Sequence, residues 1–398
     1  MNFIFVSPNF PKTYWMFCDR LKKNGANVLG IGDSPYDDLQ WELKNCLTEY
    51  YKVSSLANYD EMYRAVAYFA FKYGKIDWLE SNNEFWLAQD AQLRTDFNIT
   101  TGAQNDFIAR IKEKSAMKDS YIKAGVPVAR HHIVTPDKAA SEAFIELVEY
   151  PVIVKPNSGC GAEATYKLKS QEDLDWFYDN YPDHPYIMEE FITGTIVSFD
   201  GVAGPDAVPL FYTSNEFPTP ILDIVAENGD LHYWTVPQVD EKLKDTGFRT
   251  IKAFGAANRF FHCEFFRLTK AKKGLGEVGD YVALEVNMRP AGGYTPDMIN
   301  FANSVDSYAI WADMVTKGRC DQKLDGPHYY CVYASRRDGK TYVNSHESIL
   351  GKYAGKLVMA ERMPDALALD MGNMGYFALV DTEEEKDDFI AFVQALAN

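Results

Sequence analysis

The stretch YVALEVNMRPAGG at residues 281–293 combines the alternation of a β-strand with a group of charged and polar side chains. Because successive side chains of a strand point to opposite faces, the alternation predicts one apolar face and one face that ends in polar groups. The apolar face comprises Val282, Leu284, Val286 and Met288, and the other comprises Tyr281, Ala283, Glu285 and Asn287. The oxygen atoms of Glu285 and Asn287 suit Mg²⁺, and the guanidinium of Arg289 suits a phosphate or a carboxylate. Taken alone, the stretch also fits a strand that ends in a solvated ion pair.

The same stretch is the second half of a predicted hairpin. Residues 259–268 form a strand pattern and residues 271–280 a glycine-rich turn, so Glu264 can face Glu285 and Asn287. Two carboxylates that face each other are costly unless a cation lies between them. The hairpin therefore predicts a divalent metal site at these three residues. After it, the glycines of the loop that follows Arg289 would let the backbone approach a ligand closely.

Composition narrows the class of protein. The chain has 398 residues, of which 46% are hydrophobic, so about two to four packed units are expected. The formal net charge of −17 argues against partners such as nucleic acid or an anionic membrane, because these demand a basic face. Six cysteines without a CxxC pair are typical of reduced thiols. With no basic leader and no run of 18 apolar residues, the sequence predicts a cytoplasmic protein.

The first 105 residues alternate strand and helix patterns. Strands are predicted at 3–6, 27–31, 50–53 and 76–80, and helices at 13–23, 59–72 and 83–95. Strands that are separated by helices predict a parallel sheet and hence a Rossmann-like domain. The segment Ser7-Pro-Asn-Phe-Pro11 after the first strand lacks the glycines of a dinucleotide fingerprint, which argues against a nicotinamide or flavin dehydrogenase.

Two lysine-containing segments lie farther along the chain, at residues 107–123 and 155–162. Residues 107–123 are predicted to form one basic helix, whose lysines form a solvated face by default. These lysines are Lys112, Lys114, Lys118 and Lys123. Lys155 ends a strand and precedes a loop of small residues, 156–162, whose backbone N–H groups could surround a phosphate. The order differs from that of a P-loop, and by itself the loop also fits a flexible hairpin with an exposed lysine.

Five motifs follow one another in the chain: Lys114, Val152-Ile-Val-Lys155 with its loop, Met188-Glu-Glu-Phe-Ile-Thr-Gly194, His262-Cys-Glu264 and Leu284-Glu-Val-Asn-Met-Arg289. In this order they resemble the ATP-grasp superfamily over roughly residues 1–320. The resemblance implies a mixed α/β and α+β fold, in which a Rossmann-like domain precedes a two-lobed ATP-grasp fold and a small α+β domain. The implied domains are residues 1–105 (Rossmann-like), 106–188 (small lobe), 189–323 (large lobe with the metal and substrate site) and 324–398 (C-terminal domain).

The resemblance also implies roles for single residues. Lys114, Lys155 and Arg289 would be catalytic, and Glu264, Glu285 and Asn287 would hold Mg²⁺ or Mn²⁺. The residues that bind ATP would be Lys114, Lys155, Ser158, Gly159, Gly161, Ala162, Glu189, Glu190, Phe191 and Ile192, with 158–162 as a lid and 189–192 as a hinge beside the adenine. The substrate would contact Arg289, Gly292, Gly293 and His262. His262 either lines the site or is a buried strand histidine that is merely hydrogen-bonded.

Within the superfamily, the loop Arg289-Pro-Ala-Gly-Gly is most similar to carboxylate–amine ligases, including amino-acid ligases. Biotin carboxylase and the large subunit of carbamoyl-phosphate synthase are related, but the chain lacks the Gln-Val-Glu-His run that follows the arginine in biotin carboxylases. Thr195-Ile-Val197 also stands where many relatives carry an acidic residue for a ribose or metal contact. The resemblance thus implies an ADP-forming ligase that joins a small-molecule carboxylate to an amine through an acyl phosphate. The alternatives are an ATP-grasp kinase, carboxylase or carbamoyl-phosphate-type enzyme and a non-catalytic nucleotide-binding protein; a homodimer is an expectation.

Overall fold

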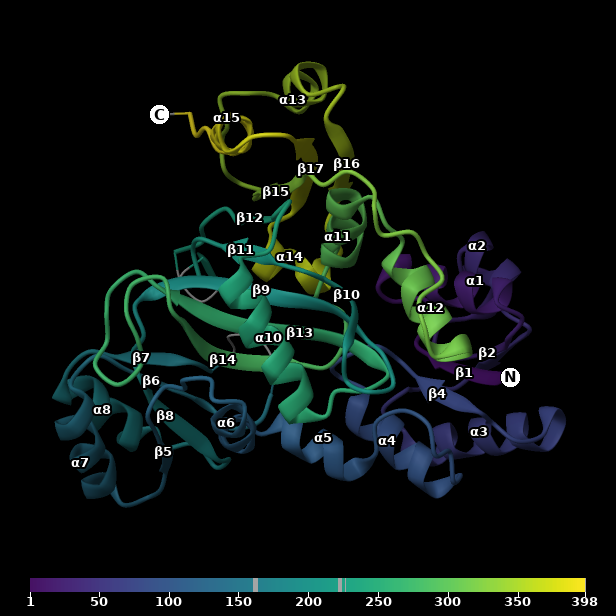
Figure 1. The fold of residues 1–398 in the computed structure, drawn as a ribbon, viewed down its shortest axis with the longest axis horizontal. Helices are drawn as coiled ribbons and strands as arrows, with labels where there is room; N and C mark the ends of the chain where they lie inside the picture. The colour runs from purple at the N-terminus through teal and green to yellow at the C-terminus, as the bar shows by residue number, and fades with distance from the viewer. Residues whose placement is uncertain (160–163, 221–223, 226, 398) are drawn as a thin grey trace.

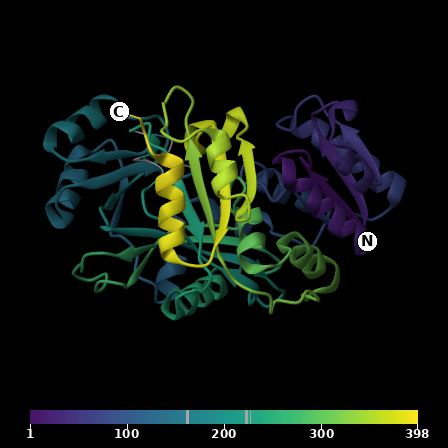
Figure 2. The ribbon, with the colours of Figure 1, turned by 90° about the horizontal axis from the view of Figure 1, so that it is seen from above.

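The computed structural model describes residues 1–159, 164–220, 224–225 and 227–397. Over these ranges the strands form three sheets, and the largest lies between the other two (Figure 1, Figure 2). The predicted lid residues Gly161 and Ala162 lie outside the described residues. None of the described helices is both long and apolar enough to span a membrane.

The N-terminal unit has a parallel sheet in the order β3-β2-β1-β4, as the alternation of strands and helices predicts. Helix α3 begins after Asn58, whose side chain accepts a hydrogen bond from the Glu61 N–H, and ends at Gly74 with φ +84°. The unit comprises β1 (Asn2–Val6), the 3-10 turn η1 (Lys12–Tyr14), α1 (Trp15–Lys23), β2 (Asn27–Gly32), the 3-10 turn η2 (Tyr36–Asp38), α2 (Trp41–Cys46), β3 (Glu49–Lys52), α3 (Tyr59–Tyr73), β4 (Trp78–Glu80) and α4 (Leu87–Asp96).

The single helix predicted over residues 107–123 is wrong, because the segment forms two helices, α5 (Asn105–Lys112) and α6 (Lys114–Lys123). Between them Glu113 is extended, with φ −97° and ψ 116°, and forms a bridge with Ser158. Asn157 satisfies the first two N–H groups of α6, since its carbonyl accepts from the Lys114 N–H at 2.7 Å and its side chain from the Ser115 N–H at 3.0 Å. The start of α6 is therefore fixed to the loop that follows Lys155.

The small lobe is an antiparallel sheet in the order β5-β8-β6-β7. Because β6 and β8 are neighbours, with Ile153 opposite Glu189, the side chains of Lys155 and Glu189 come from adjacent strands. The lobe comprises β5 (His131–Val134), α7 (Lys138–Val148), β6 (Val152–Pro156), β7 (Tyr166–Leu168), α8 (Gln171–Asp179) and β8 (Tyr186–Glu190).

The large sheet has the order β14-β13-β9-β11-β12-β15-β17-β16, with β10 also paired to β9, and its described pairs are antiparallel. The C-terminal strands β15, β17 and β16 thus extend the sheet that carries the hairpin (Figure 1). Its strands are β9 (Gly194–Ala203), β10 (Pro209–Thr213), β11 (Asn215–Phe217), β12 (His232–Thr235), β13 (Arg259–Leu268), β14 (Tyr281–Asn287), β15 (Tyr330–Arg336), β16 (Leu357–Arg362) and β17 (Met374–Val380). The helices around it are α10 (Glu241–Phe254), α11 (Thr295–Asn303), α12 (Ser307–Lys317), α13 (His346–Lys352), α14 (Asp365–Met371) and α15 (Glu383–Gln394).

The predicted faces of residues 281–288 are wrong before Glu285, because this strand contains a β-bulge. Glu264 lies opposite Glu285, whereas the next residue, Phe265, lies opposite Ala283, so Leu284 is an extra residue on β14. The extra residue reverses the alternation: Tyr281 and Ala283 join the core cluster that contains Val286, Met288 and residues of α10, while Val282 packs in another cluster. The predicted orientation of Glu285 and Asn287 away from this core is retained, because both follow the bulge.

Aromatic side chains attach the N-terminal unit to α12. The ring of Phe17 in α1 lies 4.7 Å from that of Tyr308 and 4.9 Å from that of Trp311. All three side chains are buried, and pairs of this kind add to the stabilisation from buried area. This contact places the segment after β4 beside the loop that follows β14, where Glu84 lies 3.3 Å from Arg289.

Candidate active site

The predicted carboxylate pair is present on the hairpin. Glu264 of β13 lies directly opposite Glu285 of β14, and His262 lies opposite Asn287. The Asn287 amide donates a hydrogen bond to Glu285 Oε1 at 3.2 Å. Among the described residues, no three or more His, Cys, Asp or Glu side chains are grouped so that they could hold a metal. The candidate site has only two carboxylates, Glu264 and Glu285, and its third oxygen is that of the Asn287 amide. These are hard ligands of the kind that Mg²⁺ and Mn²⁺ take.

His262 lies in the site and is held between two carboxylates. Its Nδ1 atom is 2.5 Å from Asp200 Oδ1, and its Nε2 atom is 3.2 Å from Glu264 Oε1. Burial lowers the pKa of His262, but Asp200 and Glu264 outweigh burial and raise it to about 10. Burial likewise raises the pKa of Glu264, yet His262, Arg289 and Lys155 hold it below its ordinary value. Glu264 is therefore ionised at neutral pH, as a metal ligand must be.

Asp200 is a residue of the site that the sequence analysis did not identify. It lies on β9, opposite His262, and is 1% exposed. Ser198 and the Asn215 side chain both donate hydrogen bonds to its Oδ2 atom. The available signal was the pair Ser198 and Asp200 at alternate positions of a largely apolar strand, a spacing that places both side chains on one face.

Glu189 lies between two buried lysines of the small lobe. Its carboxylate oxygens are 2.5 Å from Lys118 Nζ and 2.7 Å from Lys155 Nζ. Burial raises the pKa of Glu189, but the two ammonium groups lower it to about 2. Burial lowers the pKa of Lys118. Burial acts to lower that of Lys155 as well, but the charges of Glu189 and Glu285 outweigh burial and raise it above its ordinary value. The side chain of Glu189 thus faces the lysines, and the adenine contact predicted for its backbone stays a prediction.

Lys118 is a second residue that the sequence analysis missed. The prediction of a solvated lysine face is wrong for Lys114 and Lys118, which are 6% and 3% exposed. The two residues are four apart on α6, a spacing that puts them on one face of a helix. The two lysines of this face point to different lobes, because Lys114 Nζ lies 3.9 Å from Glu285 Oε2 of the large lobe and Lys118 pairs with Glu189 of the small lobe.

Lys114 also reaches the loop after β6. Its Nζ atom donates a hydrogen bond to the carbonyl of Gly159 at 3.0 Å, and Ser158 bridges Glu113. Gly159 has φ +124°, a conformation that side chains other than glycine rarely adopt. The start of α6, the loop and Lys155 are consequently assembled at one place, as the phosphate-binding prediction requires.

The predicted hinge connects the small lobe to the hairpin turn. The buried carboxylate of Glu190 accepts hydrogen bonds from the backbone and side chain of Arg130, both at 2.7 Å, and lies 3.2 Å from Lys272 Nζ. Lys272 also donates to the Phe191 carbonyl at 2.7 Å, and Ile192 packs in a core cluster with Val282. The Glu190 carboxylate and the Phe191 carbonyl are thus engaged within the protein, and the contact of this segment with adenine stays a prediction.

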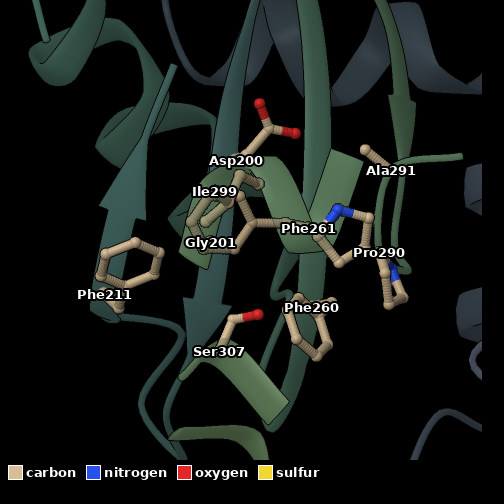
Figure 3. A pocket seen from close by; sticks show the side chains of 10 residues that line it. Asp200, Gly201, Phe211, Phe260, Phe261, Pro290, Ala291, Ile299 and Ser307 are labelled. Atoms are coloured by element: carbon tan, nitrogen blue, oxygen red, sulfur yellow. The ribbon is translucent and has the colours of Figure 1, made fainter. Parts of the chain in front are cut away.

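Arg289 connects the candidate metal site to the N-terminal unit. Its Nη2 atom donates to Asn287 Oδ1 at 3.4 Å, its Nη1 atom to the Pro290 carbonyl at 2.8 Å, and its Nε atom lies 3.3 Å from Glu84 Oε2. The next residues, Pro290 and Ala291, line a small space beside Phe260 and Phe261 (Figure 3). This space measures about 10 Å³, at the lower limit for one water molecule, so it is a packing gap rather than a substrate pocket.

The two predicted substrate-loop glycines have different surroundings. A Cβ atom on Gly292 would meet no atom within 4 Å, so open space lies beside the loop at this point. Gly293 has φ +61°, and a Cβ atom there would lie 2.5 Å from the sulfur of Met371 in α14. The C-terminal unit therefore packs directly against the loop that follows Arg289.

Gly293→Ala is expected to lower the free energy of unfolding by about 1–3 kcal/mol, because the new methyl group adds strain at positive φ and overlaps Met371. Gly292→Ala is the matched control and should change stability by less than about 0.5 kcal/mol. Urea unfolding of both variants measures the difference. If overlap with Met371 causes the loss of stability, Met371→Ala should recover part of it in the Gly293→Ala variant. A double variant whose loss is the sum of the two single losses would contradict this explanation.

Known proteins resemble this chain over part of its sequence and over nearly all of its fold. A family model described as an ATP-grasp domain matches residues 126–221, and no curated protein matches the sequence. Among solved structures, an L-amino acid ligase from Bacillus licheniformis has a TM-score of 0.70 at 12% identity, covering 98% of this chain and 95% of that one. An N5-carboxyaminoimidazole synthetase from Staphylococcus aureus complexed with ADP has a TM-score of 0.70 at 15% identity, with coverages of 98% and 96%.

A third similar structure is the biotin carboxylase domain dimer of a 2-oxoglutarate carboxylase from Hydrogenobacter thermophilus, in complex with MgADP, ADP and bicarbonate. Its TM-score is 0.70 at 13% identity, and the match covers 99% of this chain and 90% of that chain. At identities this low, the likeness shows a shared fold over nearly the whole chain.

Proposed function

The chain has the ATP-grasp fold, as its motifs predicted, and on that premise we propose that it is an ADP-forming ligase that joins a carboxylate to an amine. The observation that carries the proposal is the convergence of three groups in one site. These groups are the lysines Lys114 and Lys155, the carboxylates Glu264 and Glu285, and the guanidinium of Arg289. Lys114 lies 3.9 Å from Glu285, and the charges of Lys155 and Arg289 both act on Glu264.

In the proposed reaction the substrate carboxylate attacks the γ-phosphorus of ATP, and ADP leaves. Lys114 and Lys155 would neutralise phosphate oxygens and hold the triphosphate in place, since phosphoryl transfer depends on charge and alignment rather than on a covalent nucleophile. Glu264, Glu285 and Asn287 would hold Mg²⁺ or Mn²⁺, which supplies further positive charge to the transferred phosphoryl group. ATP and Mg²⁺ are supported by the similar structures that contain ADP and MgADP.

Arg289 would bind the carboxylate substrate, and its contact with Glu84 would orient the guanidinium. The acyl phosphate that forms is an electrophile, and attack by the amine gives the amide and phosphate. Gly292, with open space beside it, would let the substrate approach the loop. His262 would act through Glu264, because its Nε2 atom contacts that carboxylate. The fold match with an L-amino acid ligase supports an amine acceptor, and the dimeric carboxylase domain supports the proposal of a homodimer.

The test measures ADP and phosphate release with MgATP against a panel of carboxylates, each with and without amino acids, polyamines or bicarbonate. Release that requires a carboxylate and an amine together is the expected result. Release that requires bicarbonate would establish the carboxylase alternative, and release with a carboxylate alone would indicate a kinase. Formation of AMP and pyrophosphate would contradict the acyl-phosphate mechanism.

A further inference from the structure

A groove between the starts of α10 and α15 lies on the face of the large sheet that is opposite the candidate active site. In β11, Asn215 donates to Asp200 at the active site, whereas its neighbour Glu216 lines the groove. In β13, Glu264 lies at the active site, whereas Arg267 lines the groove. Because successive side chains of a strand point to opposite faces, the two sites lie back to back across the sheet. The groove has a volume of about 560 Å³, within the range of small-molecule sites.

The walls of the groove carry more acidic than basic side chains. Helix α10 contributes its N-cap residue Asp240, and α15 contributes Glu383 from its first turn. With Glu216 and Glu241 these make four carboxylates, against the guanidinium of Arg267, among the described residues that line the groove. Charge complementarity therefore favours a cationic ligand at this place.

Side chains of the sheet hold three of these carboxylates, each through one oxygen atom. The contacts are Arg267 with Glu216 Oε1 at 2.6 Å, the Tyr281 hydroxyl with Asp240 Oδ1 at 3.1 Å and the Tyr330 hydroxyl with Glu383 Oε1 at 3.3 Å. Among the described residues, no hydrogen bond reaches the second oxygen atom of any of the three carboxylates. The carboxylates are thus oriented before a ligand binds, and each keeps one oxygen atom for a cation.

Aromatic rings supply the other contacts that suit an organic cation. Trp234 lines the groove together with Tyr281 and Tyr330. The indole already contacts an ammonium group, because Lys386 Nζ lies 3.8 Å from the centre of the Trp234 ring. Aromatic faces attract cations, and methylene chains pack on the same rings. The groove therefore offers carboxylates for several ammonium groups and apolar surface for the chain between them.

We propose that this groove is a second binding site, and that its ligand is a polyamine, a flexible methylene chain that carries two or more ammonium groups. A basic amino acid is less complementary, because its own carboxylate would meet the acidic walls while Arg267 is already paired with Glu216. A single metal ion would leave the aromatic walls unused. The inference goes beyond the ligase function and does not depend on it, since no residue of the proposed mechanism lines the groove.

The experiment is isothermal titration calorimetry of the full chain with spermidine, at pH 7.5 and without ATP. Saturable binding to the wild type is the expected result. Asp240→Asn and Glu383→Gln should each weaken it about tenfold, because each removes the charge from one contact with an ammonium group. Asparagine keeps a side-chain oxygen at the N-cap of α10, and Glu383 is exposed, so the fold should tolerate both changes.

Two matched controls carry the same chemical changes outside the groove. They are Asp245→Asn, farther along α10, and Glu384→Gln, which is the exposed neighbour of Glu383 in α15. Neither residue lines the groove, so both variants should bind spermidine within about twofold of the wild type. Equal losses in the control and groove variants would mean that spermidine responds only to net charge, and would overturn the proposal.

A further variant separates the groove from the candidate active site, where an amine substrate would also bind. Glu285→Gln should leave spermidine binding unchanged, because Glu285 lies on the other face of the sheet, 3.9 Å from Lys114. Loss of binding in this variant alone would place spermidine at the active site and overturn the proposal.

Other cations test the class of ligand. L-arginine should bind more weakly than spermidine, and magnesium chloride at the same ionic strength should not reproduce the heat of binding. Tighter binding of L-arginine would assign the groove to a basic amino acid, and an equal response to magnesium chloride would indicate screening by any cation. Either result, or no saturable binding at millimolar spermidine, would overturn the proposal of a polyamine site.

Discussion

Glu285→Gln is expected to lower ATP-dependent ADP release by about 10³-fold, in the range found when a charged or polar group is removed from a preorganised site. Glu285 is opposite Glu264 and 3.9 Å from Lys114, so the substitution removes one of two candidate metal carboxylates and the nearest anion to that lysine. Because glutamine has almost the same shape and Glu285 is only half-buried, the fold should tolerate the change.

The matched control is Glu277→Gln, an exposed glutamate in the turn of the same hairpin, which should retain full turnover. ADP release is measured over a range of Mg²⁺ and Mn²⁺ concentrations for both variants and the wild type. A higher metal requirement in Glu285→Gln would link its loss to the metal site. Turnover within about threefold of the wild type would contradict the assignment of Glu285 as a metal ligand, whatever the chain catalyses.

The hairpin could be predicted because two strand-like segments flank a turn that is rich in glycine. Its two strands were expected to bring Glu264 opposite Glu285, and the structure confirms this pair. The parallel N-terminal sheet was predictable for a similar reason, since helix and strand periods alternate regularly along residues 1–105. Local pattern therefore determined these parts of the fold and the main carboxylates of the site.

Features that depend on contacts between distant segments were not predictable in this way. The bulge at Leu284 is invisible in the sequence, because nothing local distinguishes an extra residue from the alternation that it interrupts. The break between α5 and α6 depends on Asn157, which lies 42 residues after Ser115 in the sequence, and the burial of Lys118 on α6 depends on Glu189 in β8. A lysine on a helix is usually solvated, so only its tertiary partner reveals it as part of a site.

Glu189→Gln is expected to lower the free energy of unfolding by about 3 kcal/mol at pH 7. Removal of one partner from a buried ion pair is strongly destabilising, and here Lys118 and Lys155 would both lose their shared counter-charge. The pKa of Glu189 falls from an ordinary 4.5 to about 2, a change of about 2.5 units that corresponds to about 3 kcal/mol. Glu146→Gln, on the exposed side of α7 in the same lobe, is the control and should behave as the wild type.

The sign of the pKa change fixes the pH dependence of this difference. Because the folded pKa of Glu189 is below its ordinary value, the ionised carboxylate contributes its full stabilisation above about pH 4.5, and the contribution is lost as pH falls towards 2. Urea unfolding should therefore show a large difference between wild type and Glu189→Gln at pH 7 that shrinks steadily below pH 4.5. If the lysines also hold a triphosphate, MgATP supplies the missing negative charge, and it should raise the melting temperature of Glu189→Gln more than that of the wild type. A difference that stays constant from pH 7 to pH 3 would mean that Glu189 acts through packing, since only its charge can produce the predicted decline.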